Sequence, residues 1–168
     1  MKVILSHFSH EDFIYDAIRS YNQLPDMCNF KNNPNGLCLS SGDEWLDYCK
    51  SNDTYSALDY KFKSSFEVDL DQMLMCRNYL ELENIERYFG DNNGIYASNM
   101  PTNLRKKLHF IDWAFISNFT TFKGIYIKSF MSQYLSNMKL WLQDYPVDTL
   151  IAWNLSALKY LGTTKIYD

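Results

Sequence analysis

The stretch Gly36-Leu-Cys-Leu-Ser-Ser-Gly-Asp-Glu-Trp-Leu-Asp-Tyr-Cys49 carries the strongest indication of the fold. Its apolar start predicts a short buried strand, and the Ser-Ser-Gly that follows is typical of a turn. A helix is expected next, because Leu46 and Cys49 lie on one helical face and the acids at 43 and 44 suit a helix start. Hydroxyls and free backbone N–H groups therefore gather where a strand meets a helix. Such a junction can hold a phosphate-bearing ligand, although many proteins that bind nothing also contain one.

Length and composition favour a single packed domain, residues 1–168. The apolar fraction of 46% is too high for a disordered chain. The net charge of −4 argues against broad nucleic-acid binding, which needs a basic surface. The basic run Arg105-Lys106-Lys107 is explained equally well as a solvated face.

The cysteines and the N-terminal segment indicate a cytoplasmic protein. No Cys-x-x-Cys pair occurs, so reduced thiols are expected rather than disulfides or a zinc site. His7 and His10 lack a nearby third ligand, so no metal is expected there either. The apolar run at residues 3–5 is too short for a signal peptide, and no run is long enough to span a bilayer. The cysteines are Cys28, Cys38, Cys49 and Cys76.

Hydrophobic periodicity predicts an irregular mixture of strands and helices, which favours an α+β fold. The expected strands are residues 2–6, 37–39, one or two within 55–70, 73–76, 124–127, 149–153 and 165–167. Besides the helix of the opening stretch, the expected helices are residues 11–21, 80–89, 109–119 and 131–143. Residues 24–35 and 91–102 are expected to form loops.

Three places carry side chains suited to a ligand, and each also has a plain structural explanation. His7 directly follows the first strand, where it can bond a ribose hydroxyl or simply form a hydrogen-bonded wall. Ser40 and Ser41 can contact a ligand or cap the next helix. Asp148 and Thr149 precede an apolar run, and the carboxylate can orient a sugar hydroxyl or remain a solvated loop acid. The sequence contains no nucleophile elbow, P-loop or dinucleotide-binding glycine motif.

The order and spacing of these segments resemble the ADP-ribosyltransferase fold of the poly(ADP-ribose) polymerase and diphtheria-toxin type. That family carries His-Gly-Thr/Ser on its first strand. It also has a Gly-Ile/Leu-Tyr-Phe-Ala/Ser strand before a helix that often ends in Tyr-Cys, and a late strand close to Glu-Tyr-Ile-Val-Tyr-Asp. The matching segments here are His7-Phe8-Ser9, Gly36-Leu-Cys-Leu-Ser40 with Tyr48-Cys49, and Asp148-Thr-Leu-Ile-Ala-Trp-Asn154 with residues 155–161. Residues 111–126 are also similar to small phage-borne relatives.

The resemblance implies a split, mostly antiparallel sheet with flanking helices. It also implies that NAD, or a related nucleotide, binds in the cleft between the half-sheets. His7 would bind the adenosine-side ribose, and Ser9 would also lie on the cofactor. Ser40 or Ser41 would touch the nicotinamide ribose or a phosphate, and Tyr48 would line the pocket.

The catalytic position departs from the family pattern. Asp148 or Thr149 stands where the family has a glutamate that orients the reacting ribose, and Phe8 replaces a glycine that grips the nicotinamide. Loss of that glutamate's electrostatic contribution costs about two to three orders of magnitude in rate. Two functions are therefore expected: transfer of ADP-ribose from NAD to a macromolecule, or a catalytically inactive binder such as a phage-encoded inhibitor of a host protein. The acidic charge and aromatic content suit a protein partner in the host cytoplasm.

Overall fold

A computed structural model of the chain describes residues 1–23, 32–52, 57–90, 110–135, 140–142 and 145–167. The strands are β1 (Lys2–Ser9), β2 (Leu37–Ser41), β3 (Phe62–Asp69), β4 (Met73–Cys76), β5 (Gly124–Ile127), β6 (Thr149–Ala152) and β7 (Leu158–Lys165). The α-helices of this part of the chain are α1 (Glu44–Ser51), α2 (Tyr79–Phe89), α4 (Trp113–Phe119) and α5 (Ser129–Leu135). Short 3₁₀ turns occupy Ala57–Asp59, Leu70–Gln72, Leu140–Leu142 and Leu155–Ala157.

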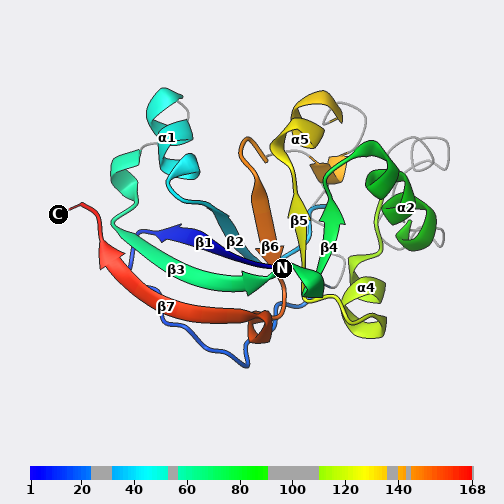
Figure 1. Ribbon diagram of the computed structural model, residues 1–168, viewed down its shortest axis with the longest axis horizontal. Helices are drawn as coiled ribbons and strands as arrows, with labels where there is room; N and C mark the ends of the chain where they lie inside the picture. Colours follow the sequence, from blue (N-terminus) through cyan, green and yellow to red (C-terminus); the bar gives the residue numbers. More distant parts are fainter. Residues whose placement is uncertain (24–31, 53–56, 91–109, 136–139, 143–144, 168) are drawn as a thin grey trace.

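The strands form one open seven-stranded sheet in the order β4-β5-β6-β2-β1-β3-β7 (Figure 1). Only β4 and β5 run parallel, and every other neighbouring pair is antiparallel. The α+β class and the mostly antiparallel sheet are therefore confirmed. The expected split into two half-sheets is wrong, because hydrogen bonds join all seven strands into one sheet; the β1–β2 ladder within it is short, with two residue pairs.

The core has two clusters, because alternate side chains of the strands point to opposite faces. One cluster joins β4, β5 and β6 to α2, α4 and α5, which lie at the same end of the molecule in Figure 1. Its largest members include Trp113, Trp141, Ile125, Ile127, Leu82 and Ile151. The second cluster extends toward β3 and β7 and includes Leu5, Leu39, Phe66, Val68, Leu150, Leu155 and Leu158.

The helix expected at residues 11–21 does not form. Ser20 instead makes an isolated bridge with Asn154, and the N–H of Tyr21 donates to the carbonyl of Trp153 at 2.7 Å. Tyr15 donates its hydroxyl to the carbonyls of Leu155 and Leu158. These long-range bonds satisfy backbone groups without a helix. They leave Ile14 and Ile18, expected on a buried helical face, 86% and 89% exposed.

The C-terminal end also differs from the sequence-based expectation. The sequence predicts a strand only at residues 165–167 in this region, but β7 runs along β3 from Leu158 to Lys165. The sequence pattern does not predict this strand, because Gly162 interrupts the alternation of apolar and polar side chains that indicates a strand. Its φ of 138° and the register shift between Ser65 and Phe66 identify an irregularity in the ladder that a glycine accommodates.

Other boundaries differ less. The helix expected from residue 109 begins at Trp113, because the Asp112 carboxylate accepts from the N–H of Phe115 and caps it. For the helix expected at residues 131–143, α5 and the turn Leu140–Leu142 are described. Most of the expected loops at residues 24–35 and 91–102, and the basic run 105–107, lie outside the described residues.

The described cysteines are free thiols, as expected. Cys76 is completely buried, and burial together with Glu81 and Glu86 raises its pKa to about 12. A thiol with such a pKa is inert at neutral pH. Cys28 lies outside the described residues.

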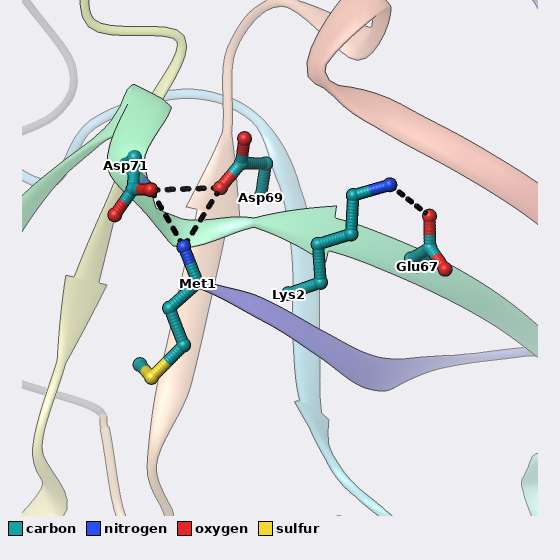
Figure 2. Close-up of polar contacts among 5 residues, drawn as sticks. All are labelled: Met1, Lys2, Glu67, Asp69 and Asp71. Carbon is teal, nitrogen blue, oxygen red and sulfur yellow. Dashed lines mark hydrogen bonds and ion pairs between the residues drawn. The ribbon is translucent and has the colours of Figure 1, made fainter.

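Ion pairs fasten the first strand to its neighbour at one end of the sheet (Figure 2). The amino group of Met1 lies 2.6 Å from Asp71 Oδ2 and 3.2 Å from Asp69 Oδ1. Lys2 pairs with Glu67 at 2.8 Å. These groups are exposed or partly exposed, so the contacts fix register more than they stabilise the fold. They support the full-length pairing of β1 with β3, which contrasts with its brief pairing with β2.

A close backbone approach between β5 and its neighbours β4 and β6 requires glycine at position 124. A Cβ on Gly124 would lie 2.5 Å from the carbonyl oxygen of Ile151 and 2.9 Å from the sulfur of Met73. We therefore expect Gly124→Ala to lower the free energy of unfolding by about 1–3 kcal/mol, measured by urea denaturation. Glu83→Ala, on the exposed side of α2, serves as the control and should change it by less than about 0.5 kcal/mol. Equal stability of Gly124→Ala and the wild type would contradict this packing of β5 on β6.

Candidate functional site

The candidate site lies at the junction of β1 and β2. Their ladder pairs only Leu5 with Ser41 and Ser6 with Ser40, whereas β1 pairs with β3 over its whole length. Beyond the last pair the backbone ladder gives way to a side-chain contact, in which His7 Nδ1 lies 2.9 Å from the carbonyl oxygen of Cys38. Because this ladder stops after two pairs, space remains between β1 and β2 although the two strands stay neighbours.

A pocket of about 230 Å³ occupies this place. Figure 1 shows its strands, β1, β2 and β6, between α1 and α5. Most of its lining is aromatic or aliphatic, and hydroxyls supply most of the polar groups, an arrangement typical of small-molecule sites. The lining residues are Ser6, His7, Phe8, Cys38, Leu39, Ser40, Trp45, Tyr60, Tyr145, Val147 and Thr149.

A row of three hydroxyl residues crosses the strands beneath the pocket. The register places Ser6 opposite Ser40 and Ser40 opposite Thr149, so the three side chains lie on one face of the sheet. All three are at most 7% exposed. Thr149 donates to the carbonyl of Val147 at 2.8 Å. This row thus forms a polar strip in an otherwise apolar pocket.

Ser40 is the unusual member of the row. Its Oγ is buried, and it has no hydrogen-bond partner among the residues that the structure describes. Leaving such a group unsatisfied costs about 1–3 kcal/mol, and buried hydroxyls in native proteins are almost always bonded. A donor and acceptor held without a partner in a pocket wall is available to a bound molecule.

His7 has a structural contact on each side. Burial lowers the pKa of its imidazole, and the hydrogen bond to the Cys38 carbonyl only partly opposes this, so the ring is neutral at pH 7. In the neutral ring, Nδ1 donates to that carbonyl and Nε2 remains an acceptor. The ring also meets Phe13 edge-on, with centroids 5.2 Å apart. His7 therefore has two roles: it bonds β1 to β2, and it lines the pocket.

The aromatic wall comes from α1 and from the start of β3. Trp45 and Tyr60 line the pocket and meet edge-on, with ring centroids 6.2 Å apart. Tyr48 stacks on Trp45 at 5.8 Å, and His10 stacks on Tyr60 at 5.4 Å. Neither Tyr48 nor His10 lines the pocket; each packs against a lining ring, Tyr48 against Trp45 and His10 against Tyr60.

Asp148 has partners of its own outside the pocket. Its carboxylate accepts from the N–H of Ser129 at 2.9 Å, from the hydroxyl of Tyr126 at 3.3 Å, and from the Lys128 ammonium. Partial burial acts to raise the pKa of Asp148, but the bonds from Lys128 and Ser129 outweigh it and hold the pKa below its usual value. Its neighbour Thr149 faces the pocket instead. Asp148 thus braces the start of β6 against the end of β5.

The structure brings together some of the site residues expected from sequence and separates others. His7, Ser40 and Thr149 line one pocket. Ser9, whose hydroxyl donates to the carbonyl of Glu11 at 2.7 Å, does not line it, and neither do Ser41, Tyr48 and Asp148. Sequence reasoning missed the ring-bearing lining residues, and their number in the composition was the only sign of them. The missed lining residues with rings are Trp45, Tyr60 and Tyr145.

Comparison with known proteins gives no relative from which a function can be carried over. No family model, curated protein or solved structure matches the chain. Within the described ranges, no cluster of three or more His, Cys, Asp or Glu side chains could hold a metal ion. Over the same residues, no helix is long and apolar enough to cross a membrane. The pocket is therefore the feature from which a function can be inferred.

The pH dependence of stability tests the bracing role of Asp148. Because its pKa is lower in the folded state, its contribution is complete above the unfolded value of about 4 and is lost as the pH falls through the folded value. We expect Asp148→Asn to lower the free energy of unfolding at pH 7 by about 1–2 kcal/mol after allowance for solvent screening. The deficit should shrink below about pH 4.

Urea denaturation at pH 3, 5 and 7 measures this dependence. Asp47→Asn is the matched control, since Asp47 is 71% exposed and lies 3.7 Å from Lys50. It should change the unfolding free energy by less than about 0.5 kcal/mol at every pH. A deficit for Asp148→Asn that does not vary with pH would contradict an electrostatic brace.

Proposed function

We propose that the chain is a binding protein for NAD or a related nucleotide, and that it seats one ring of the ligand in the pocket between β1, β2 and β6. The apolar walls suit a flat ring, and the hydroxyl row suits the polar edge of an adenine or a nicotinamide. A pocket of about 230 Å³ accommodates one ring system of a dinucleotide rather than the whole molecule. The rest of the ligand would extend beyond the mouth.

The unsatisfied hydroxyl of Ser40 carries this proposal. It lies in the polar strip of the pocket, directly across from Ser6 and Thr149. A hydrogen bond from a ligand would remove the cost of its desolvation, so ligand binding explains a group that the free fold leaves unpaired. Capping of α1, the structural alternative for this serine, is not observed, since the N-cap residue is Asp43.

Binding without catalysis fits the pocket better than ADP-ribose transfer. Transfer needs a carboxylate that orients the reacting ribose, and none of the described lining residues carries one. Asp148 is held by Lys128, Ser129 and Tyr126 away from the lining. On this proposal, the resemblance to the ADP-ribosyltransferase fold extends to ligand binding and not to catalysis. A catalytically inactive member that acts on a host protein, for example as a phage-encoded inhibitor, is consistent with such a site.

Replacement of Ser40 separates binding from folding. We expect millimolar NAD to raise the melting temperature of the wild type, because a ligand of the native state adds RT ln(1 + [L]/Kd) to its stability. Ser40→Ala should weaken NAD binding about tenfold in calorimetric titration, which corresponds to one lost hydrogen bond. Without ligand, its stability should equal or exceed that of the wild type, since an unpaired buried polar group is removed.

Ser64→Ala provides the matched control. Ser64 is also completely buried, but its Oγ lies 2.6 Å from Thr163 Oγ1, and it does not line the pocket. This variant should lose about 1 kcal/mol of stability and keep its affinity for NAD. A wild type that binds neither NAD, adenosine nor nicotinamide would refute the proposed function. Incorporation of label from tagged NAD into lysate proteins by the purified chain would favour the transferase instead.

A further inference from the structure

Lys63 does not line the pocket itself, but it contacts the lining residue Phe8, and this edge of the pocket is its rim. Lys63 on β3 pairs in register with Phe8 on β1, so its side chain leaves the sheet beside that of Phe8. Its Nζ lies 5.9 Å from the centroid of the Phe8 ring, and Phe8 lines the pocket. The Lys63 side chain is 23% exposed, which places its charged end between the pocket wall and solvent.

Asp43 holds this lysine in place. Lys63 Nζ donates to Asp43 Oδ1 at 2.7 Å. Asp43 is the N-cap residue of α1, yet its side chain makes no capping hydrogen bond to the helix. Its carboxylate is thus committed to Lys63 rather than to the backbone N–H groups of the first turn. An ammonium has three N–H donors, so the bond to Asp43 leaves donors for a ligand oxygen.

The positive end of α1 lies at the same rim. The helix begins at Glu44, next to Asp43, and Trp45 of its first turn lines the pocket. A helix N-terminus favours anions, and here it adds to the charge of Lys63. The first turn also contains the acids Glu44 and Asp47. Burial of Glu44, and next the charge of Asp148, raise the pKa of its carboxyl, whereas Lys128 lowers it. A helix start alone would not identify a site, but this one borders the pocket that contains the unsatisfied Ser40 hydroxyl.

We propose that Lys63 and the first turn of α1 bind a phosphate group of the nucleotide whose ring occupies the pocket, and that Asp43 positions Lys63 for this contact. The inference rests on the proposed function and adds a specificity to it. The pocket selects phosphorylated nucleosides over the corresponding nucleosides, because only the former reach Lys63. A phosphate at this rim would share the Lys63 ammonium with Asp43. Asp43 therefore orients the lysine but also weakens the interaction between the lysine and the phosphate.

Two ligand pairs test the proposal: adenosine against AMP, and nicotinamide riboside against nicotinamide mononucleotide. Calorimetric titration should show the monophosphate of at least one pair binding the wild type about five- to tenfold more tightly than its nucleoside, with the preference falling as salt is raised. Lys63→Gln should reduce the monophosphate to the affinity of the nucleoside and leave the nucleoside unchanged. Lys63→Arg should keep the preference. Asp43→Asn, which retains a hydrogen-bonding group without the charge, should strengthen monophosphate binding about two- to fivefold.

Lys2→Gln is the control, since Lys2 is equally cationic but pairs with Glu67 at the end of β1 remote from the pocket. Equal affinity of nucleoside and monophosphate for the wild type would overturn the phosphate site while leaving the proposed function intact. A preference that survives Lys63→Gln would overturn the role of Lys63. Binding of none of the four compounds, with none of NAD, would refute the proposed function and this inference together. Circular dichroism of each variant confirms that the fold is retained.

Discussion

The short junction between β1 and β2 is the constraint on which the rest of the structure depends. Two residue pairs and one imidazole-to-carbonyl hydrogen bond, from His7 to Cys38, join the half of the sheet that carries β3 and β7 to the half that carries β4, β5 and β6. Without these contacts the strands would form two separate sheets. The junction therefore keeps the sheet continuous and creates the pocket in the same step, with His7 serving both purposes.

The buried polar groups of this chain show two different uses. Ser64 is paired with Thr163, which also contacts Tyr160, and this network fixes β7 to β3. Ser40 has no such partner and sits in the pocket wall. Trp141 Nε1 is also unpaired among the described residues, but Trp141 lies in the core against Trp113 and does not line the pocket. A buried polar group without a partner is therefore a candidate for ligand binding only where it also borders a pocket.

Charge is distributed so that the pocket interior is neutral and its surroundings are paired. Asp148 is neutralised by Lys128 on the β5 side, and Asp43 is neutralised by Lys63 on the β3 side. A neutral interior favours an aromatic ring over an ionised group, because an uncompensated charge loses its hydration there. Any ionised part of a ligand is then directed to the rim, where partly exposed cations can meet it at little desolvation cost.

The sequence by itself determined the elements with strong local signals. The strands at residues 73–76 and 124–127, and the strand–turn–helix unit of β2 and α1, formed as expected, because periodicity and turn residues act over a few neighbours. Only the tertiary structure decided the fate of residues 11–21 and the course of β7, since bonds to residues ninety or more positions away replaced local ones. It also decided which candidate side chains share a pocket: Thr149, the first residue of β6, lines the cavity, whereas Asp148 before the strand is bonded to Tyr126, Lys128 and Ser129. Sequence patterns specify what each segment can form, whereas register across the sheet specifies which side chains meet.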